Sequence, residues 1–425
     1  MSVFCGRTPA FIVLLTFMAA LPWTSFAMAQ QRVPLTLAEA EDLVRGGEPG
    51  QLALLAQAEA MQERAIAAGS LPDPVLRVGL ANYPISGGSF STEGMTQAQL
   101  GLRQSFPRAR AQGTEKMRAQ AEVFNQGAGA RSRDVLAAVR IAWLDAFYAQ
   151  RAWELMSESR PFFADLVTIT RSMYAVGRKS QYDVLRAELE LSRLDDRLLK
   201  TNLAKSEAQA ELSRWLGQDA YRPVAMKLPG WDKLLPLEDL RAGLATHPSI
   251  AAAEAGVAAQ QAAVSIAEEQ KKPGWALDVG YGYRDGFLPD GTPRSDFVSL
   301  SVSVDLPFFG KNRQDRRLTA ALGDRSAARQ SQIEVTARLR SALDAEFARW
   351  NDLSQRLTLY ETQILEQSKG QVQAALLAYQ SDNGDFSDVM RGYIDDLNAR
   401  LEHIRLQVQR SQSYAKLANL GGLEQ

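Results

Sequence analysis

Hydrophobic and polar residues alternate with a period of two in four short segments of the chain. The clearest case is 275–284, where apolar or aromatic side chains take every second position and small or polar ones stand between them. Segment 297–306 repeats this pattern, and segments 75–83 and 96–106 show it more weakly. Such alternation is typical of a strand with one apolar and one polar face. Turn-rich stretches join the segments in pairs, so the sequence predicts two β-hairpins.

Long helical segments follow each predicted hairpin. Segments 112–174 and 316–379 each predict one helix of about 95 Å, at 1.5 Å per residue. Pro161 is expected to kink the first of them, because proline lacks the backbone N–H that a helix interior needs. Shorter helices are predicted in four further segments, which are 50–69, 180–216, 248–270 and 386–420.

The same series of features occurs twice, at an offset of about 200 residues. The pair Phe106-Pro107 corresponds to Leu306-Pro307, and Tyr174 corresponds to Tyr379. A colinear series over most of the chain indicates an internal repeat. Each repeat is expected to run as helix, β-hairpin, very long helix, turn and helix.

The repeat divides the chain into three parts. Residues 1–29 are interpreted as a secretory signal peptide, because an apolar run ends at the small-residue site Ala27-Met28-Ala29. Residues 30–234 form the first predicted repeat and residues 235–425 the second. The first repeat contains a turn at 174–183 and the start of a collar at 217–234, and the second contains a turn at 379–388.

Charge and residue usage exclude several functions. With Lys+Arg 48 and Asp+Glu 49, the chain has no basic excess that would bind nucleic acid. Its one cysteine, Cys5, falls in the predicted signal peptide, so the mature chain is expected to carry no disulfide and no lipid anchor. His247 and His403 are the two histidines, and His247 is expected in a surface turn. We find no catalytic, cofactor or metal motif and expect no enzymatic activity.

The predicted strands fit a membrane better than a soluble sheet. About nine residues suit one tilted crossing of a bilayer, and aromatic side chains such as Tyr83, Phe106 and Trp275 lie near the strand ends. Four strands cannot close a barrel, and an open edge in lipid leaves backbone groups unpaired. Several chains must therefore share one barrel. No later run of about 18 apolar residues predicts a membrane helix, and the alternative is the half-buried sheet of a soluble domain.

Doubled motifs give the chain a resemblance to the TolC family of outer-membrane efflux proteins. Tyr174-x-x-Gly177 is followed by Asp183-Val184-Leu185, and Tyr379 is followed by Asp388-Val389-Met390. Segments 104–107 and 305–311 correspond to one another where the strands end. The resemblance implies a homotrimer whose twelve-stranded barrel lies in the outer membrane of a Gram-negative bacterium, above a periplasmic α-helical barrel. It also implies a periplasmic adaptor and an inner-membrane pump, most often of the RND type.

Two short sequence motifs suggest which substrate is transported, here called the cargo. Leu71-Pro72-Asp73-Pro74 and Asn82-Tyr83-Pro84 are similar to the heavy-metal branch that includes CzcC-like proteins. Heavy-metal cations and organic compounds therefore both remain as cargo hypotheses, and secretion of polypeptides is a third. A soluble periplasmic adaptor is the alternative from a different class, although it would not explain the hairpins.

The turn of each repeat lies a full helix away from the strands and is the predicted narrow end of the tunnel. Gate candidates are Tyr174, Gly177, Asp183, Arg186, Tyr379, Asp388 and Arg391. Adaptor-contact candidates are Gly177, Arg178, Lys179, Asn383 and Gly384. In a trimer the two aspartates would form carboxylate rings that favour cations. Their spacing from Ser180 and Asp385 equally fits helix capping, and Arg391 offers Asp388 an ion pair instead.

Overall fold

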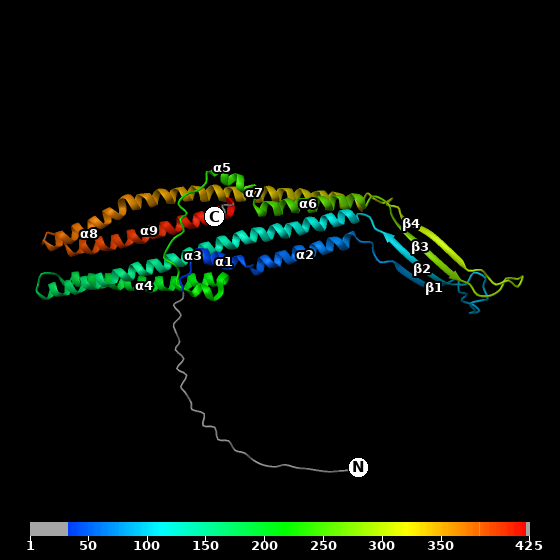
Figure 1. The fold of residues 1–425 in the computed structure, drawn as a ribbon, viewed down its shortest axis with the longest axis horizontal. Helices are drawn as coiled ribbons and strands as arrows, with labels where there is room; N and C mark the ends of the chain where they lie inside the picture. The colour runs from blue at the N-terminus through cyan, green and yellow to red at the C-terminus, as the bar shows by residue number, and fades with distance from the viewer. Residues whose placement is uncertain (1–32, 382, 422–425) are drawn as a thin grey trace, which may run out of the picture. The chain divides into compact units, whose positions relative to one another are not determined.

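The computed structural model describes residues 33–381 and 383–421. The predicted signal peptide lies outside this range. From Pro34 onward the described residues form one compact unit. This unit is mostly helical and carries one β-sheet, as predicted (Figure 1).

The sheet has four antiparallel strands in the order β1-β2-β3-β4. Their bounds are β1 Val75–Ala81, β2 Gln97–Phe106, β3 Gly274–Tyr283 and β4 Phe297–Asp305. Each strand falls in one of the segments with alternating polarity. Strands β2 and β3 come from different halves of the chain, and their pairing joins the two hairpins into one sheet.

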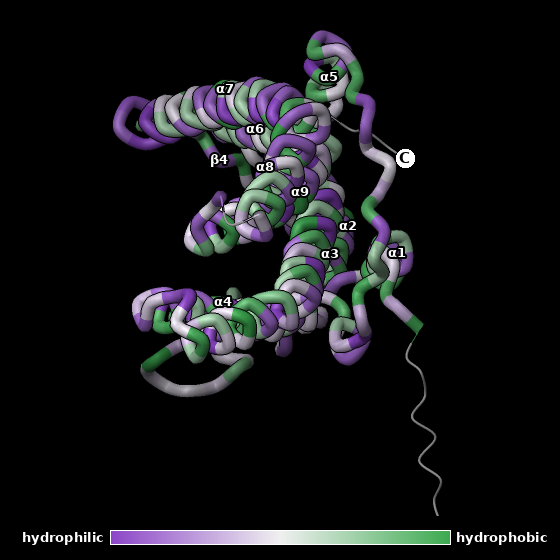
Figure 2. The backbone as a smooth tube through the Cα atoms, turned by 90° about the vertical axis from the view of Figure 1, so that its left-hand side faces the viewer, coloured by the Kyte–Doolittle hydropathy of each residue, from purple (hydrophilic) through white to green (hydrophobic). Residues whose placement is uncertain are grey.

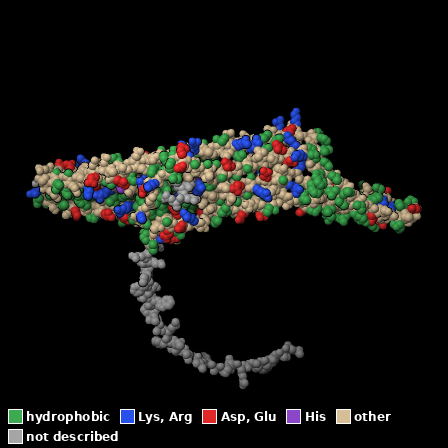
Figure 3. All heavy atoms as spheres, turned by 45° about the horizontal axis from the view of Figure 1, so that its top comes forward, with side chains coloured by type: hydrophobic (Ala, Val, Ile, Leu, Met, Phe, Trp, Pro, Cys, Tyr) green, Lys and Arg blue, Asp and Glu red, His purple; other side chains and the backbone are tan. Residues whose placement is uncertain are grey.

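The strand register places apolar side chains on one face of the sheet. Leu76 stands opposite Leu102, Leu102 opposite Val279, and Val279 opposite Leu300. Because side chains alternate along each strand, glycine, serine and charged residues fall on the other face. No described residue covers the apolar face, where Leu76, Val78 and Leu300 are 63%, 77% and 71% exposed. Figure 3 shows hydrophobic side chains gathered over this end of the molecule.

The helices extend from the sheet in two sets. In the first half they are α2 Pro49–Gly69, α3 Arg110–Ala175 and α4 Gln181–Leu216. In the second half they are α6 Pro248–Glu269, α7 Gln314–Leu359, α8 Leu365–Gln380 and α9 Phe386–Gly421. Helix α3 packs between α4 and α9, whereas α4 and α9 barely touch (Figure 2).

The predicted helix 316–379 is not a single α-helix. A π-helical turn, Tyr360–Ile364, separates α7 from α8. In the first half, α3 continues as one helix through Pro161. A π-turn accommodates an extra residue within a helix.

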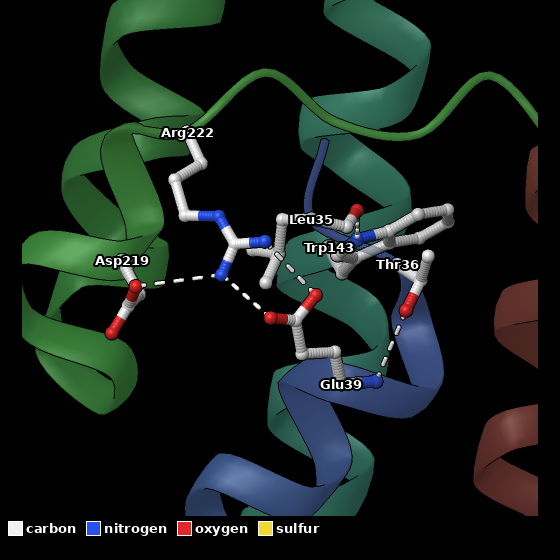
Figure 4. Close-up of polar contacts among 6 residues, drawn as sticks. All are labelled: Leu35, Thr36, Glu39, Trp143, Asp219 and Arg222. Atoms are coloured by element: carbon white, nitrogen blue, oxygen red, sulfur yellow. Dashed lines mark hydrogen bonds and ion pairs between the residues drawn. The ribbon is translucent and has the colours of Figure 1, made fainter. Parts of the chain in front are cut away.

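A collar lies beside the middle of the helices, with α1 and α5 on the same side (Figure 2). It consists of α1 Leu37–Arg45, the 3-10 helix Gly217–Tyr221 and α5 Leu237–Leu244. Leu35 forms a parallel bridge with Val224, which brings the start of the described chain to the segment after α4. The buried Trp143 of α3 donates an Nε1–H bond to the Leu35 carbonyl at 3.0 Å (Figure 4). Trp143 is thus one of the points at which the collar is fixed to the long helix, together with the ion pair between Arg140 of α3 and Glu41 of α1.

One stretch of the described chain is long and apolar enough to pass as a membrane-spanning helix, which differs from the expectation. It covers Leu237–Glu269 and includes both α5 and α6. Its apolar character comes mainly from alanine in α6, which packs against α3 and α7. The two helices are separated at the turn before Pro248.

Candidate functional site

The two predicted tip turns lie at the same end of the helices, and the sheet lies at the other (Figure 1). One turn connects α3 to α4, and the second connects α8 to α9. Buried side chains of α3, α4 and α9 form a common apolar cluster behind them, which includes Phe163, Ala187 and Met390. The two hairpins therefore support one another close to the turns.

Backbone hydrogen bonds and one glycine shape the first turn. The N–H of Gly177 binds the carbonyl of Tyr174 at 3.0 Å, and the N–H of Arg178 binds that of Met173 at 2.9 Å. Gly177 has φ +73°, a left-handed conformation that favours glycine at a helix C-terminus. Gly177 and Arg178 are exposed, and Lys179 is half-buried.

Asp183 is part of a capping box at the start of α4. The Ser180 N–H donates to Asp183 Oδ2 at 3.1 Å, and the Asp183 N–H donates to Ser180 Oγ at 3.3 Å. The carboxylate also lies in the first turn of the helix, where the partial positive charge of the helix end stabilises it. Capping thus accounts for this aspartate whether or not it also faces a pore.

In the second turn, the aspartate lies beside an arginine. Asp388 Oδ1 lies 3.8 Å from Arg391 Nη1, and both side chains are more than half exposed. The Asn383 N–H donates to the carbonyl of Ala378 at 2.9 Å, which closes the end of α8. Arg391 therefore partly neutralises Asp388, as its spacing suggested. Within one chain, no contact joins the Asp183 and Asp388 side chains of the described structure.

Tyr379 connects the two turns. Its hydroxyl hydrogen-bonds to the Met173 sulfur of α3, and the Lys179 ammonium lies 5.0 Å from the centre of its ring. Its ring also packs edge-on against Phe386 at 5.9 Å. We call the contacts of Tyr379 with Met173 and Lys179 the tip latch. They form a polar link between the α3–α4 hairpin and the α8–α9 hairpin at the turns.

Sequence reasoning found only part of this latch. Lys179 and Tyr379 were assigned to an adaptor contact and to a gate, whereas the structure brings them together. Met173 and Phe386 were missed, because the partners in the latch are separated by about 200 residues and no local motif joins them. Tyr174, the counterpart of Tyr379 in the first repeat, is 49% exposed and has no polar partner among the described residues.

The strongest electrostatic effect in the helices occurs away from the tip. Glu48 accepts two hydrogen bonds from Arg131, at 3.0 and 2.8 Å. These bonds lower the pKa of Glu48 to about 2. In the collar, hydrogen bonds from Arg222 likewise lower the pKa of Glu39 (Figure 4). Both pairs fasten the N-terminal helices to elements later in the chain.

The expectation that His247 lies in a surface turn is wrong. The side chain is only 2% exposed. Its Nδ1 accepts a hydrogen bond from the Ser249 N–H at 3.1 Å and caps α6. Burial lowers its pKa, with Arg133 adding to the effect. Across residues 33–381 and 383–421, no group of His, Cys, Asp and Glu residues has a geometry that could hold a metal ion.

Comparison with known proteins shows which proteins this chain is similar to. The sequence model of the family described as Outer membrane efflux protein matches residues 240–423. Protein CyaE of Bordetella pertussis is 29% identical over 329 residues, which cover 74% of this chain and 68% of that protein. The second half of the chain is thus similar to the outer membrane efflux proteins, and most of the chain is similar to CyaE.

Solved structures agree with the efflux-protein fold over almost the entire chain. The outer-membrane channel OprN superposes with a TM-score of 0.77 at 19% identity, covering 91% of this chain and 90% of that one. VceC of Vibrio cholerae gives a TM-score of 0.76 at 17% identity, covering 91% and 97%. These structures show that the chain has the fold of outer-membrane channels. The family whose model matches residues 240–423 is one of transport ducts.

Proposed function

We propose that three copies of this chain form a passive duct across the outer membrane and the periplasm. The observation that carries the proposal is the apolar face of the sheet, which no part of the described chain covers. Val78 and Val298, near its two edges, are 77% and 79% exposed. In lipid this face is stable, and in water it would cost roughly 25 cal/mol for each Å² of apolar surface.

The edge strands of the sheet are the reason for proposing that several copies assemble. Strands β1 and β4 each have a neighbour on one side only within the described chain. A bilayer core offers no water to satisfy the free backbone groups of such edges. If β4 of one copy pairs with β1 of the next, three sheets close into a twelve-stranded barrel and every edge is used.

The helices offer a second surface for a neighbouring copy. On α4, Tyr182, Leu185, Leu189, Leu199 and Leu203 are between 50% and 72% exposed. With the polar positions Ser192 and Asp196 included, the residues of this stripe are spaced alternately three and four apart. This is the pattern of a coiled-coil seam. We infer that this stripe packs against a helix of the next copy, so that the helices close into a tunnel below the barrel.

Cysteine cross-linking tests this assembly. A Val78→Cys variant would be combined in turn with Val298→Cys, Leu300→Cys or Val302→Cys, which share the apolar face. At least one pair should give a disulfide-linked trimer in membranes, while Val78→Cys alone should not. Cross-links absent from all pairs, in protein that remains folded, would contradict the barrel.

We propose that the tip binds a periplasmic adaptor, which couples the duct to an inner-membrane pump of the RND type. The exposed backbone of the two turns supports this role, because Gly177, Arg178 and Asn383 lie at the end of the molecule farthest from the sheet. Lys179 and Gly384 flank these positions. Energy is supplied by the pump, and the duct contributes a regulated opening.

The cargo can be proposed only as alternatives. Heavy-metal cations were suggested by the strings near the first strand, and organic compounds and polypeptides are the other two classes. A deletion strain tested against zinc, cobalt, cadmium, copper and a set of dyes separates the first two. Sensitivity to metals alone supports the heavy-metal hypothesis, whereas sensitivity to dyes alone overturns it.

A further inference from the structure

A cluster of three charged side chains lies on the polar face of the sheet. Asp278 of β3 is 3.6 Å from the Arg77 guanidinium of β1 and 3.8 Å from that of Arg103 in β2, measured between Oδ1 and Nη1. Ser303 of β4 donates its hydroxyl to Asp278 Oδ2 at 3.3 Å. One carboxylate is therefore the meeting point of side chains from all four strands.

Two glycines lie beside the Arg77 side chain in the register of the sheet. Arg77 and Asp278 belong to strands that are not neighbours, so the Arg77 side chain must cross β2. The residue that Arg77 faces in β2 is Gly101, and Gly101 in turn faces Gly280 in β3. Neither glycine places a side chain beside Arg77, and a β-carbon at Gly101 would lie 3.8 Å from the Arg77 β-carbon. Arg77 and Asp278 line a hollow of about 510 Å³ on this face.

The cluster carries an excess of positive charge. Two guanidinium groups face one carboxylate, and the Arg77 side chain is 60% exposed, compared with 21% for Asp278. The neighbouring polar positions on the strands are serine, glutamine and glycine, which add no charge. Asp305, at the helical end of β4, is already paired with Arg108 at 3.1 Å. Each chain thus presents one uncompensated positive charge in the middle of its sheet.

We propose that these clusters form a positive ring inside the barrel and make the duct favour anionic solutes, such as those bearing carboxylate or phosphate groups. This inference rests on the proposed trimer, because the polar face becomes the lumen only when the apolar face meets lipid. Three copies place three net positive charges at one level. The cation preference expected from the tip aspartates is thereby opposed, and Arg391 and the Asp183 capping box already weaken it.

The expected effect depends strongly on salt. The electrostatic potential of a charge in water extends over about 30 Å at 0.01 M ionic strength, but over only about 3 Å at 1 M. At 0.01 M the ring should reach solutes across much of the lumen. We expect it to raise the ratio of chloride to potassium permeability by about two- to fourfold, and to have almost no effect at 1 M.

Reversal potentials across planar bilayers, measured in potassium chloride gradients, test the proposal. Arg77→Gln removes the excess charge and should abolish the preference for chloride at low salt. Asp278→Asn increases the excess and should strengthen it. Arg77→Lys keeps the charge and should resemble the wild type, and Gln99→Asn is a neutral control on the same face.

The double variant Arg77→Gln/Asp278→Asn separates charge from structure. It loses the ion pair across the sheet but keeps one net positive charge, that of Arg103. Wild-type selectivity in this variant supports the ring, whereas the selectivity of Arg77→Gln would indicate a structural role and overturn it. Trimeric channels in which no variant shifts the reversal potential also overturn the inference. A wild type that forms neither trimers nor channels would instead refute the proposed function.

Discussion

Removal of the tip latch should open the duct. In Tyr379→Ala both contacts with the opposite hairpin disappear, namely the hydrogen bond to Met173 and the approach of Lys179 to the ring. The packing of Tyr379 on Phe386 also disappears, but both of these residues flank the α8–α9 turn. Because that hairpin is expected to move as one piece, the contact with Phe386 does not oppose opening, whereas the first two contacts do.

The size of the effect follows from these two contacts. A cation–π contact at an exposed site is worth about 0.5–1 kcal/mol, and a weak hydrogen bond to sulfur contributes no more than a typical net value of about 1 kcal/mol. Together they stabilise the closed tip by about 0.5–2 kcal/mol for each chain. Their loss should raise the ratio of open to closed tips by about 2- to 30-fold.

Single-channel recording in planar bilayers measures this ratio directly. Tyr379→Ala should spend more time open than the wild type, and Lys179→Ala should show a smaller increase. Tyr174→Ala is the matched control, because Tyr174 occupies the equivalent position in the first repeat without a polar partner among the described residues. Equal open times for Tyr379→Ala and Tyr174→Ala would refute the latch.

Three further predictions concern the tip and the collar. Replacing Asp183 and Asp388 with Ala should change ion conductance without preventing trimer formation, and an unchanged conductance would leave only the capping role. Glu48→Gln should lower the free energy of unfolding by about 1–2 kcal/mol at pH 7, because the charged bond to Arg131 is lost. Since the folded-state pKa of Glu48 is about 2, below its usual 4.5, this contribution should be present above pH 4.5 and fade toward pH 2 in acid unfolding curves. Trp143→Phe should destabilise the collar by about 1 kcal/mol in thermal unfolding, because the buried indole bond to the Leu35 carbonyl is lost and that carbonyl keeps only the Ala225 N–H as donor.

Local pattern predicted most of the fold. The alternating segments became strands, because a strand at a membrane boundary must separate its two faces residue by residue. The starts and ends of α4, α6 and α9 lie within one residue of the sequence prediction. Proline and glycine, together with capping residues, mark those boundaries in the sequence itself.

Features that depend on distant contacts or subtle backbone changes were not predicted. The π-turn at Tyr360–Ile364 has no signature in composition, because it differs from an α-helix only in the partners of its backbone hydrogen bonds. His247 was misjudged because its burial depends on packing near α3 and α9, which are far away in sequence. The tip latch and the Arg77–Asp278 pair likewise join segments about 200 residues apart.

Imaging of the purified, detergent-extracted protein by electron microscopy tests the central claim most directly. The account predicts particles with threefold symmetry and a central bore, in which a barrel of twelve strands continues into a ring of helices. Monomeric particles without a bore, obtained under conditions that keep the sheet and helices folded, would contradict it.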